Sequence, residues 1–68
     1  MAEIGKGMVT QIKNGDAMIR DPETGSIKKS IMIPQKITGL EPGDTVCYVY
    51  FNDMTGLIID ILQKGGDG

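Results

Sequence analysis

The sequence contains no histidine, no tryptophan and a single cysteine, Cys47. One cysteine cannot form an intramolecular disulfide, and without histidine the Ser/His/Asp and Cys/His arrangements of nucleophilic catalysis are excluded. A metal site would need oxygen ligands alone, and Asn52, Asp53 and Thr55 do not make a calcium-loop pattern. We therefore expect a non-enzymatic protein without a metal or other cofactor.

The remaining reactive groups have structural explanations. Cys47 lies inside an apolar run with no basic residue near it in the sequence, so we expect it to be a small buried hydrophobe rather than a reactive thiol. The acidic residues mostly fall in predicted turns, where carboxylates hydrogen-bond to the backbone. Those turn positions are Asp21, Glu23, Glu41, Asp44 and Asp53.

Basic and aromatic residues are also scarce. Seven Lys and Arg face nine Asp and Glu, which gives a net charge of −2, and the aromatic residues are two Tyr and one Phe. Nucleic-acid-binding proteins normally present a basic surface, and single-strand binders add aromatic platforms for stacking. The composition therefore argues against a nucleic-acid partner.

The chain is short and has no long apolar run. No segment approaches the roughly 20 apolar residues of a membrane span, and the first residues lack a secretory signal pattern, so we expect a cytoplasmic protein that does not enter the membrane. The 68 residues make one domain. Below roughly 70–80 residues a single core rarely supplies more than about 3–5 kcal/mol, which favours self-association.

Short apolar runs separated by turn residues predict an all-β fold. No run has the length and 3.6-residue period of a helix. The pattern indicates a five-stranded antiparallel barrel, OB-like or SH3-like. We expect a flexible lead-in at 1–6, one barrel domain at 7–62 and a disordered tail at 63–68. The predicted strands span 7–13, 16–21, 26–33, 45–51 and 57–62.

Turn chemistry supports these boundaries. Asn14-Gly15 is the strongest short hairpin signal, and Pro42-Gly43 has the type II turn pattern. In the first strand the apolar residues do not alternate cleanly, which predicts a bulge. After Pro34 we expect an irregular connection whose residues Ile37 and Leu40 plug one end of the barrel.

The third predicted strand alternates between two faces. Ile27, Ile31 and Ile33 share the expected inner face, and the other face carries Lys28, Ser30 and Met32.

The fourth and fifth strands are apolar on both faces, which is unusual for an antiparallel sheet. Either the 37–40 connection covers the second face, or that face is a contact surface for another protein. The candidate interface residues are Cys47, Val49, Phe51, Ile58 and Leu62.

Several short motifs resemble a known family of small barrels. They are Gly7-x-Val9, Asn14-Gly15, Asp21-x4-Ser26, Ile33-Pro34, Leu40-x2-Gly43-Asp44-x-Val46, Phe51 and Gly56-Leu57-Ile58-Ile59. Together they resemble the OB-type barrels of phage tail and baseplate proteins, the baseplate assembly protein V family, over roughly residues 5–62.

This resemblance implies a structural or assembly protein of a prophage tail, cytoplasmic or incorporated in a phage particle, whose partners are other tail proteins or further copies of itself. Two other families share the Gly-Asp-x-Val scaffold. The hydrogenase maturation chaperones need a cysteine where this chain has Ala2. Bacterial translation initiation factor one is similar in size and strand order, but it depends on basic and aromatic residues that this acidic chain mostly lacks.

A second hypothesis is a single-stranded nucleic-acid-binding OB-type module. Such a module would use cations for phosphates and aromatic rings for bases. The candidate residues are Arg20, Lys28, Lys29, Tyr48, Tyr50 and Phe51.

Overall fold

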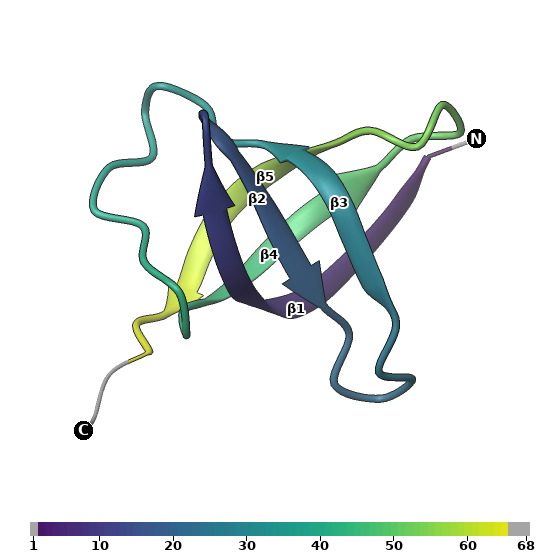
Figure 1. The fold of residues 1–68 in the computed structure, drawn as a ribbon, viewed down its shortest axis with the longest axis horizontal. Helices are drawn as coiled ribbons and strands as arrows, with labels where there is room; N and C mark the ends of the chain where they lie inside the picture. The colour runs from purple at the N-terminus through teal and green to yellow at the C-terminus, as the bar shows by residue number, and fades with distance from the viewer. Residues whose placement is uncertain (1, 66–68) are drawn as a thin grey trace.

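The computed structural model describes residues 2–65, which form five strands and no helix. The strands are β1 (Glu3–Lys13), β2 (Asp16–Arg20), β3 (Ile27–Met32), β4 (Thr45–Tyr50) and β5 (Gly56–Gln63). They close into a barrel in the order β1-β2-β3-β5-β4, with β1 also paired to β4 (Figure 1). The prediction of a small all-β barrel is confirmed. No helix within residues 2–65 is long and apolar enough to cross a membrane.

The strand order decides between the two barrel types left open by the sequence. β3 and β5 pair in parallel, whereas every other pair of neighbouring strands is antiparallel. A five-stranded Greek-key barrel of this kind is the OB type. The closing pair is short, with Ile31 opposite Gly56 and Met32 opposite Leu57.

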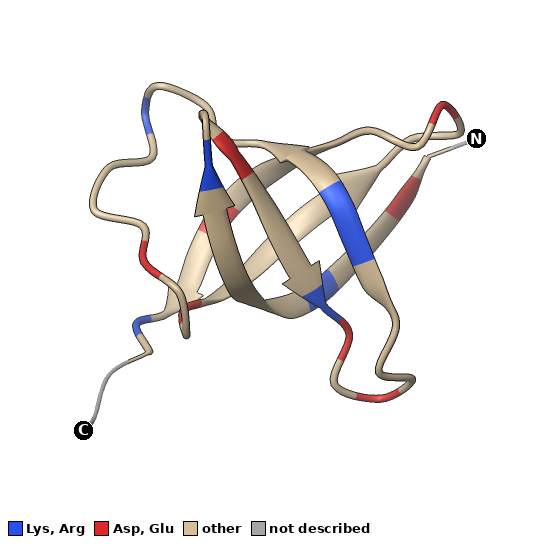
Figure 2. Ribbon diagram, viewed as in Figure 1, with Lys and Arg blue, Asp and Glu red and all other residues tan. Residues whose placement is uncertain are grey.

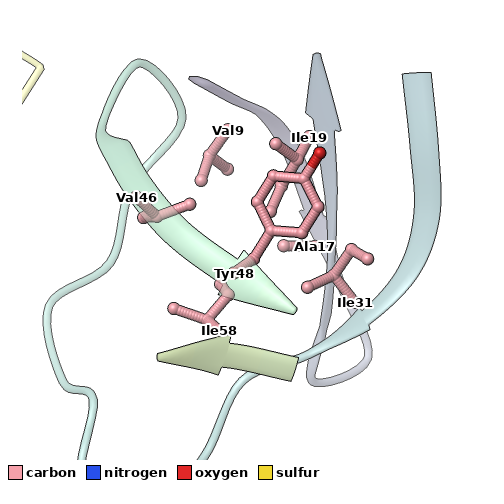
Figure 3. Close-up of a cluster of buried hydrophobic side chains, with 7 residues drawn as sticks. All are labelled: Val9, Ala17, Ile19, Ile31, Val46, Tyr48 and Ile58. Atoms are coloured by element: carbon pink, nitrogen blue, oxygen red, sulfur yellow. The ribbon is translucent and has the colours of Figure 1, made fainter. Parts of the chain in front are cut away.

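Seven side chains form the core, and they come from all five strands (Figure 3). The ring of Tyr48 lies among the others in the close-up, and three isoleucines are fully buried. The core residues are Val9, Ala17, Ile19, Ile31, Val46, Tyr48 and Ile58. Ile37 and Leu40 pack against this cluster, so the predicted plug is confirmed.

The predicted turns form as their residues require. Asn14 and Gly15 both have positive φ, 53° and 83°, in the tight turn between β1 and β2. Gly43 has a φ of 100°, and the Asp44 N–H donates to the Glu41 carbonyl at 3.1 Å, which closes the turn before β4. The predicted bulge in β1 is present between Val9 and Gln11.

The alternation predicted for the third strand is wrong. Ser30 adopts a φ of 60°, and the β2–β3 register shifts at this bulge. Because an extra residue reverses the alternation, Ile27 is 49% exposed, while Lys28 lies opposite the buried Ile19. Lys28 therefore lies at the end of the barrel, and Lys29 follows it on the outer surface.

Both predicted chain ends need correction. Residues 3–6 are not a flexible lead-in: they belong to β1 and pair with β4, Glu3 opposite Tyr50 and Ile4 opposite Val49. At the other end, Gln63 belongs to β5, and the residues after it contact Asp44. The expected disorder of 66–68 falls outside the described residues.

The two ends of the barrel differ. One end is covered by the connection 33–44 and the end of β5; we call this the plugged end. The other is formed by the start of β1, the β2–β3 loop and the β4–β5 turn (Figure 1); we call this the open end.

The buried carboxylate of Asp44 fastens the plugged end. Its side chain is fully buried and accepts hydrogen bonds from the Lys64 ammonium at 2.7 Å, the Gly65 N–H at 2.7 Å and the Glu41 N–H at 3.0 Å. Gly65 has to be glycine here, because a Cβ would overlap the Gly43 carbonyl. The main chain of the same turn also hydrogen-bonds to Val9: the Gly43 N–H donates to the Val9 carbonyl, and the Val9 N–H donates to the Asp44 carbonyl.

These contacts set the ionisation of Asp44. Burial alone would raise its pKa, but the hydrogen bonds from Lys64, Glu41 and Gly65 outweigh it and hold the pKa below the ordinary value. A carboxyl whose pKa is lower in the folded state contributes stability above its unfolded pKa. That contribution is lost as the pH falls through the folded pKa.

We expect Asp44→Asn to lower the free energy of unfolding at pH 7 by about 1.5–3 kcal/mol, because the amide nitrogen would replace one carboxylate oxygen and face the donors that it accepts from, and the charge that pairs with Lys64 would be lost. Urea unfolding measures this loss. Between pH 7 and pH 3 the wild type should lose stability more steeply than the variant. Asp16→Asn, at the exposed start of β2, is the control and should change stability by less than about 0.5 kcal/mol. A wild-type-like Asp44→Asn would contradict this role.

Candidate nucleic-acid interface

Four of the seven basic residues lie on three neighbouring strands, three of them near the open end and Lys29 on the outside of β3. Arg20 ends β2 and lies opposite Met8 and Ile27, and Lys28 and Lys29 lie in the first half of β3. Lys6 lies two residues before Met8 on β1. Figure 2 shows blue segments on β3, at the arrowhead of β2 and on the adjacent part of β1. The sheet thus brings together the three predicted cations and adds Lys6.

Carboxylates lie among these cations. Glu3 begins β1, and Asp21 and Glu23 lie in the β2–β3 loop. Asp21 fixes that loop: its Oδ1 accepts the Glu23 N–H at 2.8 Å, and its own N–H donates to the Ser26 carbonyl at 2.8 Å. The open end therefore offers both positive charges and hydrogen-bond acceptors, in contrast to a uniformly basic patch.

The predicted aromatic platforms are arranged differently from the expectation. Tyr48 is only 4% exposed, so its ring packs in the core and cannot stack on a base. Tyr50 is half-buried, and the Lys28 ammonium lies 5.1 Å from its ring centroid, in a cation–π contact. Phe51 is exposed at the start of the β4–β5 turn. Tyr50 thus positions a cation, and Phe51 alone of the three presents an exposed ring.

The hydroxyl of Tyr48 has a different environment from its ring. Gly5 lies opposite Tyr48, and a Cβ at that glycine would lie 3.1 Å from the hydroxyl oxygen. The missing side chain leaves room for the phenol at the open end. Burial, and then the negative charges of Asp21 and Glu3, raise the pKa of Tyr48 above the ordinary tyrosine value.

The predicted protein-interface residues do not share one surface. Ile58 is fully buried in the core, because it lies opposite the inward-facing Tyr48. Cys47 and Val49 are half-buried on the outside of β4, and Phe51 and Leu62 are exposed. Cys47 is therefore not the buried hydrophobe that we expected, and it lies between Lys6 and Asp60 on the neighbouring strands.

An apolar row that the sequence did not reveal crosses four strands on the outside of the barrel. Ile4 lies opposite Val49, Val49 opposite Leu57, and Leu57 opposite Met32. Ile4 is 72% exposed. The second apolar face of β4 and β5 is thus only partly covered within the chain, and the plug covers the barrel end instead.

Sequence reasoning missed Glu3 and Lys6 because both fell in the presumed lead-in. The available signal was the pair Gly5 and Gly7, which allows a long first strand to bend closely against its neighbours: a Cβ at Gly7 would overlap Ile19. Within residues 2–65, no group of three His, Cys, Asp or Glu side chains could hold a metal ion.

The barrel is similar to a solved structure, that of the eukaryotic translation initiation factor 5A from Methanococcus jannaschii. The similarity covers 91% of this chain at 28% sequence identity, with a TM-score of 0.72. The chain spans about half of that protein, 47% of its length. No family model matches the chain, and no curated protein matches it in sequence.

This similarity contradicts the predicted function. The expectation of a prophage tail or baseplate component is wrong. The expectation that the partners are tail proteins or further copies of this chain, and that nucleic acid is not a partner, is also wrong. The motifs behind that expectation are turn residues such as Asn14-Gly15 and Gly43-Asp44. Their role is to close turns, which any barrel of this strand order needs, so they carry little information about function.

Tyrosine titration tests the environment of the open end. In Tyr50→Phe, Tyr48 is the one tyrosine left, and we expect it to ionise above the ordinary tyrosine value of about 10. Adding Glu3→Gln and Asp21→Asn should lower the pKa of Tyr48 part of the way toward the ordinary value, because two negative charges that oppose the phenolate are removed while the burial remains. Absorbance of tyrosinate follows the titration. A Tyr48 that ionises at or below the ordinary value would contradict the described arrangement.

Proposed function

We propose that this chain is a non-enzymatic RNA-binding module that acts in translation and binds single-stranded RNA through the β2–β3 face beside the open end. The observation that carries the proposal is the similarity to a translation initiation factor over 91% of the chain. Because the chain spans about half of that protein, the proposal concerns the barrel alone.

The strand order supports the choice of surface. In OB barrels the face formed by the second and third strands is the usual surface for oligonucleotides. Here that face carries Arg20 and Lys29 on its outside, and Lys28 lies at its end against Tyr50. Phosphates need such cations, and exposed apolar side chains such as Ile27 offer surface to the bases.

The chemistry of the chain supports a binding role over a catalytic one. The sequence has no histidine, and its one cysteine is half-buried on the outside of β4. The carboxylates with lowered pKa values, Asp44 and Asp53, hydrogen-bond to turns. A role in translation also fits the cytoplasmic location expected from the sequence.

The net charge predicts the character of the binding. With a charge of −2 the whole molecule repels RNA at long range. Affinity therefore has to come from the four cations Lys6, Arg20, Lys28 and Lys29 on the β2–β3 face and beside the open end. We expect moderate affinity that depends strongly on salt.

Fluorescence anisotropy with labelled single-stranded RNA between 50 and 200 mM salt tests this. If four cations each contact a phosphate, log affinity should fall with log salt concentration with a slope of about −3, so that affinity drops roughly 50-fold over this range. Arg20→Gln and Lys29→Gln should each weaken binding and make the slope shallower by about 0.7.

The matched control is Lys36→Gln, which removes the same charge from the exposed connection at the plugged end. It should leave the slope unchanged. Binding that is absent at 50 mM salt, or that Lys36→Gln weakens as much as Lys29→Gln does, would refute the proposed surface.

Co-sedimentation with purified ribosomal subunits tests the link to translation. We expect the wild-type chain to pellet with subunits at low salt and the Arg20→Gln/Lys29→Gln double variant to stay in the supernatant, since ribosomal RNA supplies the phosphates. Equal pelleting of both proteins would contradict RNA contact through this face.

A further inference from the structure

A hollow of about 610 Å³ opens at the open end of the barrel. Its size is within the range of sites that enclose small organic groups. The start of β1, the β2–β3 loop, β3 and β4 all contribute to its walls. The polar side chains that matter for its chemistry are Glu3, Asp21, Lys28 and Tyr48.

Contacts within the barrel hold three of the wall groups, Tyr48, Asp21 and Lys28, in place. The Tyr48 ring is fixed in the core, so the hydroxyl can move little, and Gly5 leaves space beside it. The Asp21 Oδ1 accepts the Glu23 N–H, which orients the carboxylate and leaves Oδ2 as a further acceptor. The cation–π contact with Tyr50 holds the Lys28 ammonium at the rim. The polar groups of the hollow are thus largely preorganised.

The hollow offers two kinds of hydrogen-bonding partner. The Lys28 ammonium donates, the carboxylates of Glu3 and Asp21 accept, and the phenol of Tyr48 can do either. A complementary ligand therefore presents an acceptor and a donor side by side. Every RNA base has some donor and some acceptor on its edge, but guanine and cytosine combine an exocyclic amino group with a carbonyl oxygen. Uracil donates only through one ring N–H, and adenine accepts only through ring nitrogens.

The hollow also adjoins the cations of the proposed RNA-binding face. Lys28 lines the hollow, and Lys29 follows it on the outside of β3. A base that enters the hollow would leave its flanking phosphates near Arg20 and Lys29. Proteins commonly read single-stranded RNA in this way, with the backbone on cations and a splayed base hydrogen-bonded along its edge.

We propose that the hollow is a base-reading pocket for an unpaired nucleobase that carries both an amino and a carbonyl group, guanine or cytosine. This inference rests on the proposed RNA-binding function. The carboxylates of Asp21 and Glu3 accept from the amino group, and the Lys28 ammonium, with the Tyr48 hydroxyl, donates to the carbonyl oxygen.

Fluorescence anisotropy with labelled RNA oligonucleotides tests the pocket. The reference is oligouridine of about nine nucleotides, within the length that one OB barrel covers, and three further versions carry one central guanine, cytosine or adenine. At 50 mM salt we expect the guanine or cytosine version to bind about tenfold more tightly than the uridine and adenine versions. Asp21→Asn and Tyr48→Phe should each reduce this preference to about twofold or less.

Two further variants keep the test clear if Tyr48→Phe is unstable. Glu3→Gln changes the exposed first residue of β1 and should also reduce the preference, whereas Asp16→Asn, which makes the same kind of charge change at the other end of β2, should retain it. None of the four variants should make the salt dependence shallower, because none removes a cation.

The outcomes separate the two proposals. Salt-dependent binding of all four RNAs with equal affinity would overturn the base-reading pocket and leave the RNA-binding function standing. A preference that survives both Asp21→Asn and Glu3→Gln would also overturn the pocket. No binding of any RNA at 50 mM salt would refute the proposed function itself.

Discussion

The buried carboxylate of Asp44 is the contact on which the rest of the barrel depends. Its side chain binds the Glu41 N–H, the Lys64 ammonium and the Gly65 N–H, while its carbonyl accepts the Val9 N–H at 2.8 Å beside the bulge of β1. One residue therefore joins the first strand, the turn before β4 and the end of β5. A charge so deeply buried is stable only when fully hydrogen-bonded, and here every bond comes from a segment that has to be in place for the barrel to close.

The Asp44 contacts and the plug lie at one end of the barrel, and the hollow lies at the other. At the plugged end, Ile37 and Leu40 cover the core and Asp44 holds the turn that follows. Within residues 2–65, no comparable connection crosses the open end, where the hollow lies. Stability is thus concentrated away from the surface that carries Lys6, Lys28 and the phenol of Tyr48, and these groups remain accessible on a rigid frame.

Local chemistry made much of the fold predictable. Asn14-Gly15, Pro42-Gly43 and the uneven pattern of the first strand each specify a backbone conformation through residues close in sequence, and each was found where it was predicted. The bulge at Ser30 was not predictable in this way, since a serine with positive φ has no sequence signal and follows from the pairing of β3 with distant strands. That single bulge decided which of Lys28 and Ile27 reaches the barrel end.

The site was predictable to a smaller extent. Arg20, Lys28 and Lys29 could be named from composition, because cations are few in this chain. Their partners Glu3 and Lys6 could not, since their position depends on the pairing of β1 with β4, a contact between residues more than 40 positions apart. The role of Tyr48 was also misjudged, because alternation alone does not say that a ring is buried while its hydroxyl reaches a hollow.

We propose that RNA contacts the open end and the β2–β3 face of this barrel. Backbone amide chemical shifts, followed by NMR while single-stranded RNA is added to the labelled chain, test it most directly. We expect the largest changes in residues 3–8, 20–29 and 48–51, with little change in the plugged end around 36–44. Changes that centre on 36–44 or on the apolar row of Ile4, Val49, Leu57 and Met32, or no changes at all, would contradict it.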